Sequence, residues 1–355
     1  MREQGKKIKK VYVESDYAPL KAVYLANASG FHVPDMDIAW DMANMMAHNI
    51  PESKEYMRKH AGKFLGDADP ERYAKVVAES DALAKAYRDN GVYVIRNESG
   101  VIPEEQITFS ESWSGQKLVG TYAQAAWEVV GNALINFWEV SAEMGVEFQA
   151  REAVVEFFRN DPEAKWYSMP FPVPTSWPDP GPRTSAGDIK IFDGKKILWG
   201  IGVADPTHMT DFSKARSSGD EFAAEMFRRM IEPLGWTVDI VYFDSNYSYH
   251  LDCVLAPLKE GLLSYPKGSL WTPLPQWLRN WEVIDVSRED NTLGCTNNVP
   301  LGNNKVIVCE EAHKYCEDLD KAGMNVIPVP YFHIFNIIGT RLYCPSSAIH
   351  REKGE

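Results

Sequence analysis

The stretch "IKIFDGKKILWGIG" (Ile189–Gly202) holds two apolar runs separated by an Asp-Gly pair. Asp-Gly between two such runs is a strong local signal for a tight hairpin, because glycine accepts the positive φ that the turn requires. An amphipathic helical pattern follows over Asp220–Gly235, and another apolar run covers Thr237–Phe243. The region therefore predicts two antiparallel strands, a helix and a third strand.

The same order of patterns returns elsewhere in the chain. A Gly-Asn pair separates two apolar runs in Trp127–Phe137, which the helical pattern of Ala150–Asp161 follows. Further strand and helix patterns lie at Leu20–Ser29, Pro51–Asp89, Val92–Arg96 and Asn304–Pro330. This repetition predicts an α/β fold built from ββαβ modules. We expect one catalytic domain over residues 1–355, with the proline-rich Tyr167–Ser185 as an ordered loop.

Bulk composition narrows the class of protein. The chain has 355 residues, of which 45% are hydrophobic and 25% charged, as in globular proteins. Its net charge is −13, and the only dense basic cluster is the short "KKIKK" at residues 6–10, so we expect no nucleic-acid partner. No run approaches the ~18 apolar residues of a membrane span. No apolar signal segment is present, and the five cysteines form no CxxC pair. These features predict a cytoplasmic protein with reduced thiols and no membrane association.

The stretch "NYSYHLDCVLAPL" (Asn246–Leu258) reads as a buried strand with two titratable residues inside it. On a strand, His250 and Asp252 point to the same face, whereas Cys253 points to the opposite face and is expected in the core. The His–Asp pair is either a structural hydrogen bond or part of a catalytic site, because histidine moves protons near neutral pH.

Two further residues are candidates for chemistry. Asp188 follows small residues in "SAGDIKIF", where it either contacts a ligand or caps a turn. Cys344 in "IIGTRLYCPSS" follows an apolar run read as a strand, and it is either inert core or a nucleophile. His313 and Cys316 form an isolated HxxC pair without the second pair that a zinc site requires, and no nucleotide-binding glycine motif occurs. We therefore expect no metal and no cofactor.

Taken together, Asp188, then His250-x-Asp252, then Cys344 resemble the guanidine-modifying, or pentein, superfamily, and most closely its amidinotransferases. The resemblance covers most of the chain, since "VESDYAPLKAVYLA" (Val13–Ala26) looks like the opening strand of these enzymes and "TNNVPLGNNKVIV" (Thr296–Val308) like a late one. It implies a five-bladed α/β propeller of ββαβ pseudo-repeats around a central active site.

The resemblance also implies a reaction. Asp188 and Asp252 hold a guanidinium, Cys344 attacks its carbon, and His250 first protonates the leaving amine and then activates the acceptor. The donor is then arginine or a similar compound, and the acceptor an amine. One alternative is a cysteine-dependent hydrolase of a guanidino compound (an amidinohydrolase, dihydrolase or deiminase). Another is a non-catalytic binder of a cationic metabolite. Members of the superfamily include dimers, so the resemblance allows a homodimer.

Five other residues are candidates for substrate binding by resemblance. Lys267 is alternatively an exposed loop lysine, and one of the two neighbouring asparagines is expected to serve turn structure. Arg341 is interpreted as a solvated strand residue rather than as a ligand of a substrate carboxylate. The candidates are Glu128, Lys267, Asn297, Asn298 and Arg341.

The chain departs from the family pattern in two places. Many members carry Gly-Gly-Gly-x-His before the nucleophile, whereas here the run is "GTRLYC", with Tyr343 in place of the histidine. Deiminases and several hydrolases carry a glutamate before the first aspartate, but Ser185 stands there in this chain. The second departure favours amidino transfer over hydrolysis.

Overall fold

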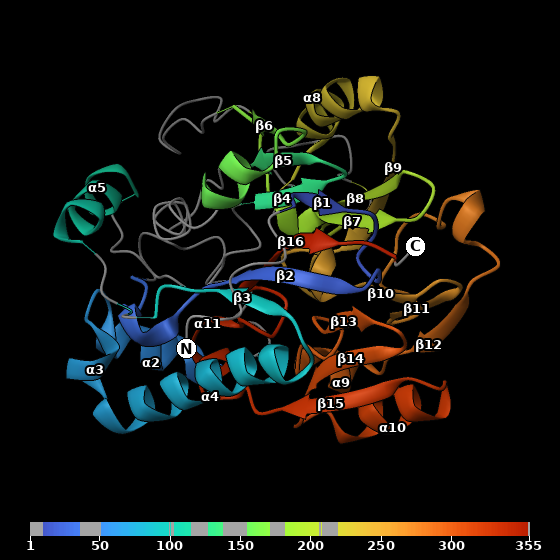
Figure 1. Cartoon of the computed structure of the whole chain (residues 1–355). Helices are drawn as coiled ribbons and strands as arrows, with labels where there is room; N and C mark the ends of the chain where they lie inside the picture. Colours follow the sequence, from blue (N-terminus) through green and yellow to red (C-terminus); the bar gives the residue numbers. More distant parts are fainter. Residues whose placement is uncertain are drawn as a thin grey trace.

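The computed structural model describes residues 10–35, 51–98, 100, 103–114, 127–137, 155–170, 182–205, 207 and 219–353. The strands of these residues form five separate sheets (Figure 1). Each sheet contains an antiparallel pair of strands and a third strand parallel to the second, and we call each sheet a blade.

The opening stretch of the sequence forms one such blade. Strands β7 (Ile189–Phe192) and β8 (Lys196–Val203) are antiparallel, and β9 (Thr237–Asp244) lies parallel to β8. The turn between β7 and β8 places Gly194 at φ 74°, in the left-handed region that glycine enters without steric cost. Helix α8 (Glu221–Ile231) connects β8 to β9. The prediction of a ββαβ module is confirmed here.

Three more blades have the same strand order, and they differ in what joins the last two strands. Residues 155–160 are helical in one of them, and α10 (His313–Lys321) occupies this place in another. The remaining blade has only a 3₁₀ turn, η6 (Gln276–Leu278), within the proline-containing "WTPLPQWL", because proline disfavours a longer helix. The strands are β4 (Trp127–Val130), β5 (Ala133–Asn136) and β6 (Lys165–Ser168); β10 (Ala256–Lys259), β11 (Leu262–Tyr265) and β12 (Glu282–Asp285); β13 (Val299–Gly302), β14 (Lys305–Cys309) and β15 (Asn325–Val329).

The fifth blade joins distant parts of the chain. Strand β16 (Ser346–Arg351) pairs antiparallel with β2 (Leu20–Leu25), which pairs parallel with β3 (Tyr93–Ile95). The short β1 (Tyr12–Val13) lies on the other side of β16.

The helical region before β3 is divided, whereas the sequence pattern was continuous. It forms α2 (Pro51–His60), α3 (Leu65–Ala68) and α4 (Pro70–Asp89). Asp69 caps α4 by accepting a hydrogen bond from Arg72 N, and a proline suits the first turn of a helix. The other short elements are η1 (Ala28–Gly30), α5 (Glu104–Ser114), η2 (Ala186–Asp188), η4 (Glu232–Leu234), η5 (Leu251–Cys253), α9 (Arg288–Thr292) and α11 (Phe335–Ile338).

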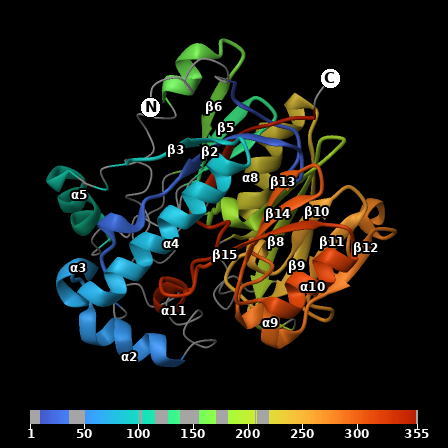
Figure 2. The same ribbon diagram turned by 60° about the horizontal axis from the view of Figure 1, so that its bottom comes forward.

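The blades are arranged as a propeller. The first strands of neighbouring blades contact one another, β7 with β10 and β10 with β13, while β13 contacts β2 and β16 contacts β4. Trp199 of β8 is fully buried, and its ring lies 6.4 Å from that of Phe137 after β5 and 5.2 Å from that of Phe227 on α8. The predicted five-bladed α/β propeller is confirmed. Figure 1 shows α4, α8 and α10 at the periphery, and Figure 2 shows α4 and α10 at the front when the bottom of that view comes forward.

Two expectations on the wider organisation have different outcomes. One hydrophobic cluster includes residues of every blade, which supports the single domain over residues 1–355, and that range stays a prediction. Within the described part of the chain, every helix is too short or too polar to cross a bilayer.

One predicted element is wrong. The sequence favoured a continuous strand over Asn246–Leu258, but the His-x-Asp motif lies in the 3₁₀ turn η5, and β10 begins only at Ala256. The backbone N–H of Leu251 donates to a carboxylate oxygen of Asp188 in another blade, at 3.2 Å. The turn is therefore accompanied by a contact between two blades of the propeller. The apolar residues of Asn246–Leu258 predict a strand but give no sign of this contact.

Candidate active site

The candidate residues share one position in the repeating blade. Asp188 directly precedes β7, His250 and Asp252 precede β10, Asn297 precedes β13, and Cys344 precedes β16. Strands β7, β10 and β13 contact one another in succession, and β13 contacts β2, which pairs with β16. The repeat itself therefore brings the residues from four blades toward the same region.

Asp188 and His250 are held by contacts between η2 and η5. A carboxylate oxygen of Asp188, which is fully buried, accepts the Leu251 N–H, and the Ser185 hydroxyl lies 3.1 Å from His250 Nε2. A side chain at Gly187 would place its Cβ 2.7 Å from the imidazole Cγ and Nδ1. The small residue at position 187 therefore lets the imidazole approach the backbone beside Asp188.

Asn297 connects Asp252 to Cys344. Its amide nitrogen donates to an Asp252 oxygen at 3.1 Å. Its amide oxygen accepts from the backbone N–H groups of Tyr343 and Cys344 at 2.8 and 3.2 Å, and from the Cys344 thiol at 3.5 Å. One buried side chain thus fixes both the turn that carries the thiol and the carboxylate beside it. The other oxygen of Asp252 is buried and has no hydrogen-bond partner among the described residues.

The expectation that Cys253 points away from the site is wrong. The sulfur atoms of Cys253 and Cys344 and an oxygen of Asp252 lie within 4.8 Å of one another. Alternation of faces applies to a strand, whereas η5 is a 3₁₀ turn. The hydrogen bond between Cys253 and Cys344, together with burial and the charge of Asp252, raises the pKa of the Cys253 thiol well above its usual value.

Tyr343, the residue before Cys344, takes part in a buried polar cluster. Its hydroxyl donates to Asp16 at 3.3 Å, and the Lys190 ammonium lies 3.8 Å from the ring centroid and 3.9 Å from Asp16. Burial raises the pKa of the Tyr343 hydroxyl, which therefore remains a donor. Sequence reasoning missed Asp16 and Lys190; the only signal was the lysine inside the apolar run of Ile189–Phe192.

The candidates for substrate binding have different surroundings. Glu128 is buried in β4, where a carboxylate oxygen accepts the Val129 N–H at 3.2 Å, and its charge contributes to the raised pKa of Tyr343. Asn298 is also buried, but it donates to Cys295 O and to the Tyr315 hydroxyl. Lys267 is largely exposed and lies 3.7 Å from Asp285. The structure thus brings Asn297 to Cys344, gives Asn298 a packing role, and leaves Lys267 on the surface.

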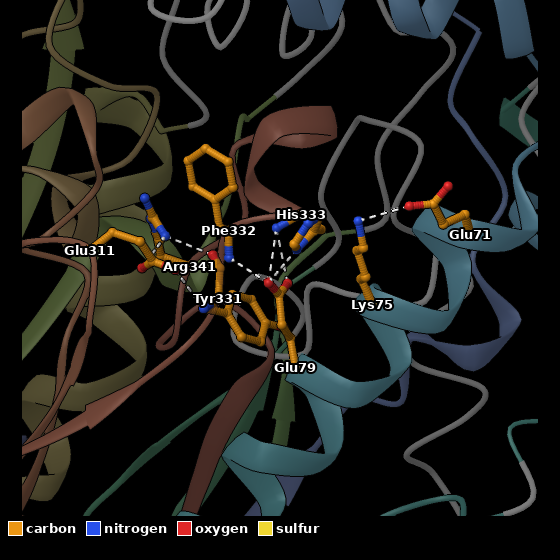
Figure 3. Close-up of polar contacts among 8 residues, drawn as sticks. All are labelled: Glu71, Lys75, Glu79, Glu311, Tyr331, Phe332, His333 and Arg341. Carbon is orange, nitrogen blue, oxygen red and sulfur yellow. Dashed lines mark hydrogen bonds and ion pairs between the residues drawn. The ribbon is translucent and has the colours of Figure 1, made fainter.

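Arg341 is buried, which contradicts the expectation of a solvated residue. Its guanidinium lies 3.6 Å from the Phe335 ring centroid. The guanidinium also donates to Tyr331 O at 2.6 Å and lies 3.4 Å from Glu311 (Figure 3). It follows the helix α11 rather than a strand, so the strand assignment before Cys344 was also wrong.

A second anchor holds the same segment from helix α4, which leads into β3 of the fifth blade. Glu79 of α4 accepts hydrogen bonds from the backbone N–H groups of Phe332 and His333 and contacts the His333 ring at 2.7 Å (Figure 3). Together with the contacts of Arg341, this carboxylate fixes the chain that leads to the nucleophile turn.

One cluster has donors suited to a metal ion. Among the residues that the structure describes, Asp252, Cys253 and Cys344 are the only three such side chains whose ligand atoms lie close enough to share an ion. Two thiols and a carboxylate suit a soft divalent cation such as Zn²⁺, which would occupy the Cys344 sulfur. The expectation that the protein works without metal or cofactor stays a prediction.

Comparisons with known proteins give matches at the level of structure alone. No protein-family model matches the sequence, and no curated protein matches it. An amidinotransferase of saxitoxin biosynthesis, SxtG from Microseira wollei, superposes with a TM-score of 0.74 at 17% identity, over 97% of this chain and 98% of that one. The inosamine-phosphate amidinotransferase StrB1 from Streptomyces griseus gives 0.69 at 19%, over 97% of both chains.

A hydrolase shows a weaker likeness. The dimethylarginine dimethylaminohydrolase of Pseudomonas aeruginosa, solved with citrulline, gives a TM-score of 0.61 at 15% identity, over 93% of this chain and 99% of that one. All three identities are too low to transfer an activity, but the coverage is nearly complete in each case. The chain therefore has the pentein fold of these amidinotransferases, a five-bladed α/β propeller.

Proposed function

We propose that this protein is an amidinotransferase that moves an amidino group from arginine or a similar donor to an amine, through a covalent amidino-cysteine. The observation that carries the proposal is the link of Asp252 to Cys344 through Asn297, and the contact of Asp188 with Leu251 in the same turn, between His250 and Asp252, supports it. The pentein fold and the small residues before Asp188 support transfer as the reaction.

The two aspartates provide recognition of a cation. A guanidinium is planar and presents paired N–H groups, which carboxylates accept in charge-assisted hydrogen bonds. Asp252 has an oxygen that makes no hydrogen bond among the described residues, so a substrate N–H can satisfy it. Because this oxygen is buried, leaving it without a partner costs about 1–3 kcal/mol, and a bound guanidinium removes that cost.

The reaction then proceeds in two steps. The Cys344 thiolate attacks the guanidino carbon, His250 gives a proton to the departing amine, and the C–N bond breaks to leave an amidino-thioether and a neutral amine. In the second step, His250 takes a proton from the incoming amine, whose nitrogen attacks the amidino carbon. The C–S bond breaks and the thiolate of Cys344 is regenerated.

Product analysis separates transfer from its alternatives. The protein is incubated with arginine, with and without a panel of primary amines, and ornithine, citrulline, urea and ammonia are quantified. Ornithine that forms only with an acceptor supports the proposal. Ornithine with urea, or citrulline with ammonia, would establish a hydrolase, and the absence of both turnover and any cysteine adduct would leave a binder of cations.

The close packing of Gly187 on His250 gives a second test. We expect Gly187→Ala to lower kcat by about 10- to 100-fold, because its Cβ displaces the imidazole and misplacing a reacting group by about 1 Å costs this much. Gly194→Ala is the control: its Cβ meets only the end of Lys196, at 4.0 Å, but its φ of 74° costs stability. A Gly187→Ala enzyme with wild-type kcat would contradict the assigned role of His250.

The identity of the acceptor amine, a homodimeric assembly and a cytoplasmic location stay predictions. Nothing in the proposed reaction requires a nucleic acid or a membrane. The proposed roles of Lys267 and Arg341 in substrate binding receive no support from their surroundings, since one is exposed beside Asp285 and the other is buried against Phe335.

A further inference from the structure

The site contains a second thiol for which the proposed reaction has no use. The sulfur of Cys253 lies within 4.8 Å of the sulfur of Cys344, and both contact the Asn297 amide group. They belong to different blades and are 91 positions apart in the sequence (344 − 253). The other three cysteines lie outside this cluster of Asp252, Cys253 and Cys344.

We propose that Cys253 is a resolving cysteine, which forms a reversible disulfide with Cys344 when the protein meets a hydroperoxide. The disulfide would occupy the Cys344 sulfur, so the protein could not attack a substrate until the disulfide is reduced. The disulfide itself does not require amidino transfer; only its effect on turnover depends on the proposed function.

The chemistry balances with hydrogen peroxide as the oxidant. The Cys344 thiolate attacks one peroxide oxygen and the O–O bond breaks, giving a sulfenic acid on Cys344 and hydroxide, which becomes water on taking a proton. The Cys253 sulfur then attacks the Cys344 sulfur, the S–O bond breaks, and the hydroxyl leaves as water with the Cys253 proton. Two thiols lose two electrons in total, and one peroxide is reduced to two waters.

The distance between the two sulfurs decides what happens to an oxidised Cys344. A sulfenic acid without a nearby thiol is oxidised further to irreversible forms. Cys253 lies close enough to intercept it, because the sulfurs need to approach from within 4.8 Å to a bond of about 2.05 Å.

Both cysteines lie in segments that suit this approach. Cys253 ends the 3₁₀ turn η5, and Cys344 precedes β16, so neither sulfur is carried by the hydrogen-bonded interior of a sheet. Asn297 contacts both sulfurs, since its amide nitrogen donates to Cys253 and its amide oxygen accepts from Cys344.

The test oxidises the whole protein with hydrogen peroxide in the presence of a chelator, which removes any metal from the thiols. We expect the intact mass to fall by about 2 Da and non-reducing peptide mapping to find the Cys253 peptide linked to the Cys344 peptide. Dithiothreitol should restore the original mass and most of the lost activity.

Two variants distinguish disulfide formation through Cys253 from oxidation of Cys344 alone. In Cys253→Ala, peroxide should add about 32 or 48 Da at Cys344, and dithiothreitol should restore neither mass nor activity. Cys316→Ala, which removes a partly buried thiol from α10, should behave as the wild type. The absence of the linked peptide, or full recovery of peroxide-treated Cys253→Ala, would overturn the proposal. Because mass is read without turnover, failure here is distinct from failure of the proposed transferase.

Discussion

Replacing Cys344 with alanine is expected to lower amidino transfer by at least about 10⁴-fold, because the variant lacks the atom that forms the covalent intermediate. The nearby Cys253 is not expected to take over, because the turn η5 holds its sulfur in a different position from that of Cys344. Ornithine formation from arginine with an amine acceptor measures the loss. Intact mass after rapid quenching should show an amidino adduct on the wild type and none on the variant.

The same variant distinguishes binding from chemistry. Asp188 and Asp252 are unchanged in Cys344→Ala, so calorimetry should detect arginine binding with an affinity within about tenfold of the wild type. Cys316→Ala serves as the control for loss of a thiol, and its turnover should equal that of the wild type. A Cys344→Ala protein that keeps more than a tenth of the wild-type rate would refute covalent catalysis at this residue.

Asn297→Asp is expected to lower kcat by about 10²- to 10³-fold, the second largest effect after that of Cys344→Ala. A carboxylate at this position still accepts the N–H groups of Tyr343 and Cys344, but it faces the Asp252 oxygen that the amide now holds at 3.1 Å. Two carboxylates at that distance repel each other unless they share a proton, which raises the apparent pKa of one of them. The loss should therefore be greatest at high pH and shrink as the pH falls and the pair gains its proton.

Asn298→Asp provides the matched control for this experiment. Asn298 is the next residue, is equally buried and also donates two hydrogen bonds, but its partners are Cys295 O and the Tyr315 hydroxyl. Its replacement should reduce the free energy of unfolding by about 1–3 kcal/mol, measured in urea, without the pH-dependent loss of kcat. Equal pH profiles for the two variants would show that Asn297 matters only for folding.

The repeating hairpins were predictable because their signals are local. An Asp-Gly or Gly-Asn pair between apolar runs specifies a turn from a few adjacent residues, and the strands of β7–β8 and β4–β5 follow from it. The order of Asp188, His250, Asp252 and Cys344 then indicated the site through its resemblance to the guanidine-modifying superfamily.

The remaining features depend on contacts between blades. Leu251 is held in a 3₁₀ turn by Asp188, so an apolar segment that resembles a strand takes another conformation and Cys253 turns toward the nucleophile. Arg341 is buried because Phe335, Glu311 and the Tyr331 carbonyl surround its guanidinium. No periodicity in the sequence encodes these partners, which are between 6 and 63 positions away (341 − 335 and 251 − 188).

The pairing of β16 with β2 has a consequence for the order in which the protein is made. Four blades use strands that are close together in the sequence, so each can form as soon as the ribosome releases it. The fifth blade waits for β16, whose preceding turn carries Cys344. Closure of the propeller and delivery of the Cys344 thiol to the site thus coincide, and under the proposed mechanism a chain that has not yet added β16 cannot carry out amidino transfer.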